Sequence, residues 1–227
     1  DWVDWGLHED VTAIENAWYY DALSCLRRMA EVLGKNTDDL ADRMERIRTG
    51  YASLWTEKGY KSRGVLAPDD RANALAVIAG LAEPDQYDVL TDVLTKTKHA
   101  SPYMEYYVLE ALCRMDRFTA AKERMLRRYG PMIRQDDSTL WELWIKIGGT
   151  RNHAWSGGPM VIMSKYFAGI RPVRPGWEEF IIRPQTDLTE TLACTVPKVK
   201  GYIRLNAYRT DGTLVMETAL PKDTTAV

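Results

Sequence analysis

The sequence predicts a mainly α-helical protein with a β-rich tail, in which antiparallel helical hairpins form an (α/α) toroid or an α-solenoid. Two observations support this prediction. From residue 12 to about residue 170, helices that are apolar on nearly all sides alternate with helices that carry one apolar stripe. After Gly169, prolines and alternating apolar and polar residues replace the helical pattern. The second pattern is typical of β-strands, which we expect to form part of a β-sandwich.

Composition limits the class of protein. The 227 residues are 45% hydrophobic and 27% charged, with a formal net charge of -2, which is ordinary for a soluble globular protein. Lys and Arg are spread along the chain, which argues against a nucleic-acid partner. No apolar run reaches the roughly 20 residues that span a bilayer, so no membrane partner is expected. The opening "DWVDWGLHED" does not resemble a secretory signal peptide. We therefore expect a piece of a longer protein or a processed product.

The helices come in two kinds. A helix that is apolar on all sides must be enclosed by other elements, whereas a striped helix covers a core from outside. The enclosed kind is expected at 12–33, 70–82, 103–115 and 159–170. The striped kind is expected at 37–57, 84–98 and 117–129. Strict alternation indicates antiparallel hairpins whose first members form an inner ring. No repeat of fixed length is visible, which favours the toroid over an ordinary solenoid.

The connections also differ in kind. Those before striped helices are plain, as in "GKNTDD", whereas those before enclosed helices are rich in Trp, Asp, Glu and His. All enclosed helices of such a ring start at the same end, so the rich connections are expected to meet on one face. Convergent aromatic and titratable groups at a ring mouth suggest a binding site. The alternative is that these aromatics merely seal the end of the ring.

The tail begins with "IRPVRPGWEEFIIRPQ" and continues with "KVKGYIRLNAYRTDGTLVMETAL". The second stretch alternates apolar and polar residues on both sides of "TDGT", which predicts a β-hairpin. We therefore expect a helical domain at 1–170 and a β-rich segment at 171–227.

Glu142 lies between Trp141 and Trp144 in the segment "STLWELWIKIGGTRNHAWSGGP". Aromatic neighbours reduce hydration, so they are expected to raise the pKa of this carboxyl and suit it to proton transfer. Aromatic faces also stack on sugar rings, and glycoside hydrolysis uses two carboxylates. The alternative for Glu142 is a carboxylate that merely starts a helix.

Several spaced motifs resemble one family. "TLWELW", "GGTRNHAWSGGP" and "YFAGIRPVRPGWEEFIIRP" follow the order seen in the C-terminal half of the bacterial α-L-rhamnosidases, as do "DWVDWG", "DDRANALAVIAGL" and "SPYMEYYVLEAL". Members are six-hairpin glycosidases with an (α/α)6 barrel and a C-terminal β-sandwich. The resemblance thus implies part of an (α/α)6 toroid followed by part of a sandwich, from a bacterial cytoplasm or periplasm.

The resemblance implies roles for individual residues. Glu142 matches the general base, which activates water to hydrolyse a terminal α-L-rhamnoside with inversion. His153 matches a sugar-contacting histidine and Trp2 an aromatic of the rhamnose pocket, although a lone His is often structural. Further substrate contacts are suggested by loop position alone. These are Trp5, Trp155, Glu105 and Asp70. For Glu105 and Asp70, capping of a helix start is an equal alternative.

The family's general acid has no counterpart in the chain, so we expect the isolated chain to be inactive or nearly so and to self-associate through exposed apolar helix faces. The expected ligand is a rhamnose-containing glycoside or polysaccharide. Other readings stay open: a glucoamylase-like or uronyl hydrolase-like enzyme, a non-catalytic carbohydrate-binding toroid, and an α-solenoid interaction module. No cofactor is expected, and the histidines lack metal-binding spacing, although scattered acids leave calcium open.

Overall fold

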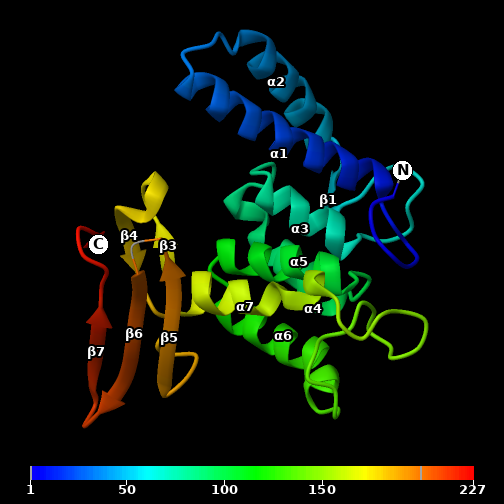
Figure 1. The fold of residues 1–227 in the computed structure, drawn as a ribbon. Helices are drawn as coiled ribbons and strands as arrows, with labels where there is room; N and C mark the ends of the chain where they lie inside the picture. The colour runs from blue at the N-terminus through cyan, green and yellow to red at the C-terminus, as the bar shows by residue number, and fades with distance from the viewer. Residues whose placement is uncertain (1, 200) are drawn as a thin grey trace. The chain divides into compact units, whose positions relative to one another are not determined.

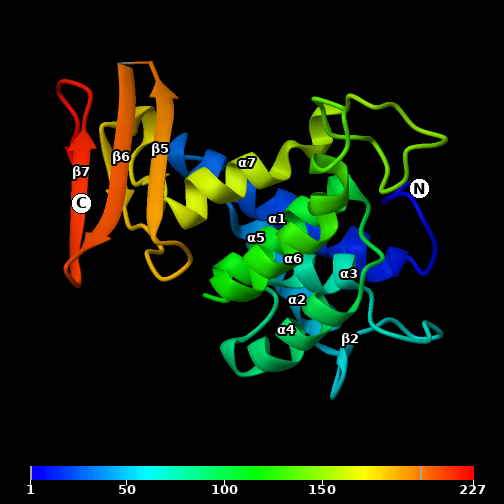
Figure 2. The same cartoon turned by 90° about the horizontal axis from the view of Figure 1, so that it is seen from below.

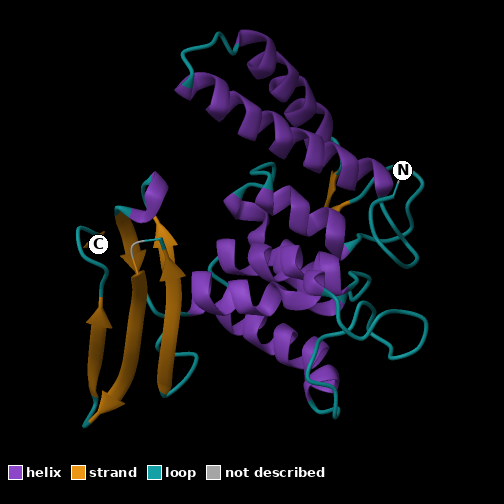
Figure 3. Ribbon diagram, viewed as in Figure 1, coloured by secondary structure: helices purple, strands orange, loops and turns teal. Residues whose placement is uncertain are grey.

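Helical hairpins make up the chain as far as Ser156. The computed structural model describes residues 2–199 and 201–227, and the chain divides into two compact units, one ending at Ser156 and one from Gly157 to Val227. The prediction of a mainly helical chain with a β tail is confirmed (Figure 3). The sequence-based division after residue 170 places the last predicted helix with the hairpins, whereas this division by contacts places it with the strands.

The first unit contains three hairpins. They are α1 (Val11–Val32) with α2 (Asp38–Ala52), α3 (Asp70–Ile78) with α4 (Tyr87–Lys96), and α5 (Pro102–Arg114) with α6 (Phe118–Ile133). The first members α1, α3 and α5 lie side by side in one row (Figure 1). Every residue of α3 is buried, including three polar ones, and nine of the thirteen residues of α5 are buried. These two helices are enclosed as predicted.

Helix α1 differs from the prediction. It was expected to be enclosed, yet it buries only one side, through residues such as Ile14 and Leu23. Its second half exposes apolar side chains, among them Met29 (57% exposed) and Val32 (87% exposed). In the described part of the chain, α1 packs mainly on α2 and α3, and Trp18 meets Tyr107 of α5 edge-on at 4.8 Å.

Two helix ends were predicted too far along the chain. The stretch 37–57 ends as a helix at Ala52, and the following residues form the short antiparallel pair β1 (Trp55–Thr56) and β2 (Gly59–Tyr60). The stretch 70–82 ends as a helix at Ile78, because Gly80 takes a φ of +70° that stops the helical path. Helix α6, in contrast, continues past the predicted residue 129 and through Pro131.

The second unit begins with α7 (Gly158–Ile162) and the π-helical turn η3 (Met163–Phe167), which are shorter than the predicted helix 159–170. Strand β3 (Ile170–Pro172) starts at once, because Gly169 turns the chain with a φ of +67°. A Cβ at this glycine would lie 1.9 Å from the carbonyl oxygen of Arg183, so only glycine fits.

Two three-stranded sheets complete this unit. Strand β4 (Glu179–Ile182) lies between β3 and β8 (Thr225–Ala226), and β6 (Gly201–Thr210) lies between β5 (Thr191–Lys198) and β7 (Thr213–Ala219), as Figure 2 shows for the second sheet. The predicted hairpin is confirmed, with Thr210 paired to Thr213 across Asp211 and Gly212, both at positive φ. Phe180, Ile203 and Leu205 from the two sheets share one core.

The short 3-10 turns are η1 (Pro84–Gln86), η2 (Ala154–Gly157) and η4 (Pro175–Trp177). Across residues 2–199 and 201–227, none of the helices has both the length and the apolar character that crossing a bilayer requires.

Candidate active site

The rich connections meet as predicted, and buried arginines join them. Arg71, on the first turn of α3, is fully buried. Its guanidinium donates to Asp69 Oδ1 (2.9 Å), to Asp4 Oδ2 (3.3 Å) and to the carbonyl oxygen of Leu7 (3.0 Å). Asp4 Oδ2 also accepts from the amide of Ser101 (3.0 Å), in the connection before α5. The N-terminal segment is thus fastened to the starts of α3 and α5.

Arg124 of α6 holds the two acids that were predicted as sugar contacts. Its Nη2 donates to Asp70 Oδ2 (2.7 Å) and to Glu105 Oε2 (2.8 Å), and its Nε donates to Glu105 Oε1 (2.5 Å). Both carboxylates are fully buried. Burial alone would raise the pKa of Asp70, but the attraction of Arg124 keeps it below its ordinary value. Both carboxylates therefore serve as counter-charges of Arg124 in the described structure.

Capping of the helix starts was the alternative role for Asp70 and Glu105. The residues that cap these helices are Asp69 and Ser101. Asp69 caps α3 by accepting from the amide of Arg71, and Ser101 caps α5 by accepting from the amide of Met104. Asp70 and Glu105 lie inside the first turn of each helix, so their side chains turn toward α6 instead.

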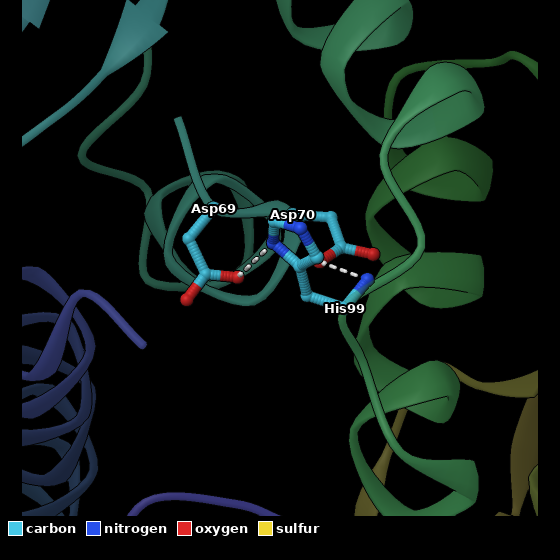
Figure 4. A group of neighbouring side chains, drawn as sticks. All are labelled: Asp69, Asp70 and His99. Atoms are coloured by element: carbon cyan, nitrogen blue, oxygen red, sulfur yellow. Dashed lines mark hydrogen bonds and ion pairs between the residues drawn. The ribbon is translucent and has the colours of Figure 1, made fainter. Parts of the chain in front are cut away.

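Asp69, Asp70 and His99 bring possible ligand atoms within 4.8 Å of one another (Figure 4). A divalent cation at this point would meet two guanidinium groups, because Arg71 and Arg124 already donate to the two carboxylates. We therefore assign the group to the ion-pair network, since like charges so close together disfavour metal binding.

Aromatic rings from three connections form a cluster, here called the aromatic cluster: Trp2, Trp5, Tyr103, His153 and Trp155. Trp2 lies parallel to Trp155 with ring centroids 6.4 Å apart, and His153 stacks on Trp155 at 4.0 Å. Tyr103 lies 5.5 Å from Trp155 and 6.0 Å from Trp2. Trp5 meets Trp2 edge-on at 6.1 Å. Trp2 and Trp5 are 56% and 49% exposed, so the cluster offers ring surface to a ligand.

Glu142 adjoins this cluster. The indole Nε1 of Trp155 donates to the carbonyl oxygen of Glu142 (3.1 Å), and the amide of His153 donates to the carbonyl oxygen of Leu140 (3.0 Å). The two tryptophans that flank Glu142 in sequence do not present their faces to solvent as sugar platforms. Trp141 is 5% exposed, and Trp144 has the Arg128 guanidinium 4.0 Å above its ring. These two rings anchor the segment that carries Glu142.

The pKa of Glu142 is lowered, whereas the sequence had suggested a raised value. The backbone amide of Thr150 donates to Glu142 Oε2 (2.8 Å), and the Thr150 hydroxyl donates to the same oxygen (3.0 Å). These bonds stabilise the ionised carboxylate and outweigh the loss of hydration, because the side chain is half-exposed. The two donors both use Oε2, and none of the described residues makes a hydrogen bond to Oε1.

Sequence reasoning missed Tyr103 and the three arginines. Tyr103 had a visible signal, since it stands in the rich connection "KHASPYME" beside a helix start. Arg71, Arg124 and Arg128 had none, because a charged residue in a helical pattern is normally assigned to a solvent-facing side. Their burial depends on acids from distant parts of the chain.

Comparison with known proteins identifies the family. The model of the bacterial alpha-L-rhamnosidase 6 hairpin glycosidase domain matches residues 1–167, and that of the bacterial alpha-L-rhamnosidase C-terminal domain matches residues 169–227. The chain belongs to the bacterial α-L-rhamnosidase family. An α-L-rhamnosidase of Streptomyces avermitilis is 25% identical over 259 residues, covering 100% of this chain. The chain spans only 24% of that relative's length.

Solved rhamnosidase structures share the fold. The GH78 rhamnosidase of Bacillus sp. GL1 matches 94% of this chain with a TM-score of 0.81 at 23% identity, and the chain covers 25% of that structure. The S. avermitilis α-L-rhamnosidase complexed with L-rhamnose matches 100% of this chain with a TM-score of 0.83 at 22% identity, and 24% of that structure is covered. These likenesses, together with the two matched domains, support the predicted assignment to part of a six-hairpin domain and a C-terminal β domain.

Proposed function

We propose that this chain supplies the general base and part of the sugar pocket of an enzyme that hydrolyses terminal α-L-rhamnosides with inversion. One observation carries the proposal: Glu142 has a half-exposed carboxylate outside any ion pair of the described residues, and its backbone carbonyl accepts a hydrogen bond from Trp155 of the aromatic cluster. The carboxylates at the other helix starts, Asp70 and Glu105, form ion pairs with Arg124. Membership of the α-L-rhamnosidase family supports the choice of reaction.

The chemistry assigned to Glu142 requires an ionised carboxylate. Its lowered pKa keeps it ionised at neutral pH, because the Thr150 amide and hydroxyl stabilise the negative charge. Oε1 would accept a proton from a water molecule while that water attacks the anomeric carbon. The attack comes from the side opposite the leaving group, so the configuration inverts.

The aromatic cluster is proposed to bind the sugar. Apolar C–H faces of a rhamnose ring would rest on the exposed indole of Trp2 and on the half-buried indole of Trp155, with Trp5 and Tyr103 at the margin. His153 would donate or accept a hydrogen bond with a sugar hydroxyl. Its Nδ1 is buried without a hydrogen-bond partner among the described residues, so the bond to the sugar would come from Nε2 of this half-buried ring. The S. avermitilis structure named above contains L-rhamnose, which supports that sugar as the ligand to test.

An inverting mechanism needs a second carboxylate roughly 6.5–9.5 Å from the first. Asp70 and Glu105 are buried and paired with Arg124, so neither is free to donate a proton to a leaving group. We propose that the general acid comes from a part of the ring outside these 227 residues, as the length of the relatives allows. The isolated chain should then bind rhamnose weakly and turn over almost none.

Two measurements test the proposal. Titration of the 227-residue chain with L-rhamnose, followed by tryptophan fluorescence, should show saturable quenching that L-glucose does not produce. In a longer enzyme containing this chain, aryl α-L-rhamnoside should be cleaved and aryl glucoside should not, with β-L-rhamnose as the first product seen by NMR. Preference for the glucoside would favour another (α/α)6 glycosidase. Rhamnose binding without cleavage, unchanged in Glu142→Gln, would favour a non-catalytic carbohydrate-binding toroid. Rapid turnover by the 227-residue chain alone would contradict the missing acid.

A further inference from the structure

Trp144 links the loop that carries Glu142 to the helices. The amide of Glu142 donates to the carbonyl oxygen of Thr150 (2.9 Å), which closes a loop with Trp144 inside it. Lys146 of this loop pairs with Asp137 of the same segment (3.0 Å). The Trp144 indole, in contrast, contacts residues outside this loop. Its Nε1 donates to the carbonyl oxygen of Ala100 (2.7 Å), and its ring meets Tyr129 of α6 edge-on at 5.0 Å.

Arg128 of α6 covers the free face of that indole. Its guanidinium carbon lies 4.0 Å from the ring centroid of Trp144. Its Nη2 donates to the same Ala100 carbonyl oxygen that accepts from the indole (2.5 Å), and its Nε donates to Glu105 Oε2 (3.3 Å). The side chain is only 13% exposed. One planar cation therefore contacts the loop of Glu142, the connection before α5 and the ion-pair network at once.

We propose that Arg128 is a positioning residue for Glu142. Its guanidinium packs on the Trp144 indole and holds that indole at the Ala100 carbonyl, which fixes the loop that carries Glu142. The proposal rests on the function proposed above for Glu142, because it gives a reason for a fixed carboxylate. Arg128 touches neither Glu142 nor the aromatic cluster in any described contact. Its effect passes through the backbone between Trp144 and Glu142.

The chemistry of the guanidinium explains why arginine suits this place. A planar, delocalised cation can stack on an indole and donate along its edge at the same time, whereas a lysine ammonium is a point charge without a stacking face. The neighbouring Arg127 is exposed on the same helix, with no described ion pair or ring contact. It offers a matched control at an adjacent position.

The test uses the 227-residue chain and four variants: Arg128→Met, Arg128→Lys, Trp144→Phe and the control Arg127→Met. Amide hydrogen exchange over residues 138–152 reports the mobility of the loop, and a carbon-13 NMR titration reports the pKa of the Glu142 carboxyl. Arg128→Met should raise exchange in this loop about tenfold, the equivalent of one desolvated cation–π contact. The pKa of Glu142 should rise toward its ordinary value as the Thr150 bonds loosen. Arg128→Lys should resemble Arg128→Met.

The remaining variants keep the test decisive. Trp144→Phe keeps the ring but loses the bond to Ala100, so it should shift both readouts in the same direction by a smaller factor. Arg127→Met should match the unmodified chain. If Arg128→Met does not fold, Arg128→Lys and Trp144→Phe carry the test. A folded Arg128 variant with unchanged loop exchange and unchanged Glu142 pKa would overturn the proposal. Neither readout depends on rhamnose, so a chain that binds no rhamnose would count against the proposed function alone.

Discussion

Two kinds of carboxylate lie in the connections that meet on one face of the helical unit. They differ in burial and in the groups that bind them. Asp70 and Glu105 begin the enclosed helices α3 and α5, and both are fully buried against Arg124. Glu142 lies in a loop, half-exposed, and accepts hydrogen bonds from the neutral donors of Thr150. In sequence the three acids look alike, since each is expected near the start of an enclosed helix on the same face of the ring.

The comparison shows what makes an acid available for chemistry. A carboxylate carried into the interior by an enclosed helix needs a cation, and the ion pair then uses up its acceptor oxygens. A carboxylate on a loop can stay ionised through neutral donors and keep an oxygen for a substrate. One of the cations that pair with the buried acids, Arg128, also contacts Trp144 in the loop that carries Glu142.

The largest expected effect comes from removing the charge of the exposed acid, Glu142. In a longer enzyme containing this chain, Glu142→Gln should lower turnover about 10²–10⁴-fold, the usual contribution of a general base. Affinity for L-rhamnose and the melting temperature should stay nearly unchanged. Steady-state kinetics and calorimetry on the same preparation check both. A large loss of stability would instead place Glu142 with the structural acids.

Removal of the cation should produce the opposite pattern. Arg124→Met leaves two buried carboxylates short of a partner, so the free energy of unfolding should fall by about 3–5 kcal/mol. Urea denaturation of the 227-residue chain measures this. The control is Lys96→Met, which removes an exposed pair with Asp92 and should cost about 1 kcal/mol or less. Equal effects from the two substitutions would mean that the buried network adds little.

Tyr103 and Glu105 test the comparison within a single helix turn. They lie two residues apart on α5, yet Tyr103 joins the aromatic cluster and Glu105 points to Arg124. Tyr103→Ala should weaken L-rhamnose binding about 2–10-fold, in line with the loss of one aromatic contact. Tyr103→Phe should retain the affinity. Isothermal titration separates the two, and an unchanged affinity in Tyr103→Ala would remove this residue from the sugar pocket.

The smallest expected effect concerns pH. Glu142 must be ionised to act as a base, so activity should be lost as the pH falls through its pKa. The lowered pKa extends activity toward acid. Thr150→Ala removes the hydroxyl bond but keeps the amide bond, so the acid limb of the kcat/KM profile should move upward by less than about one pH unit. A shift downward would contradict the role given to Thr150.

Much of the fold could be predicted from the pattern of apolar residues. The alternation of enclosed and striped helices located three hairpins, and "TDGT" located the β6–β7 turn. Helix ends were less certain, because Gly80 and the β1–β2 pair interrupt patterns that remain helical in sequence. For α1, the composition predicted an enclosed helix, but enclosure depends on neighbours that a helix cannot specify by itself.

Within the site, the sequence alone determined which residue types occur in each connection, and its motifs singled out Glu142, His153 and Trp2. Only the tertiary structure decided which acids remain free. That outcome depends on Arg124 and Arg128, which reach Asp70, Glu105 and Trp144 from α6 across long separations in the chain. Local sequence fixes where a charge is attached. The distance to an opposite charge, and hence the pKa and the availability of each carboxylate, is set by packing between elements.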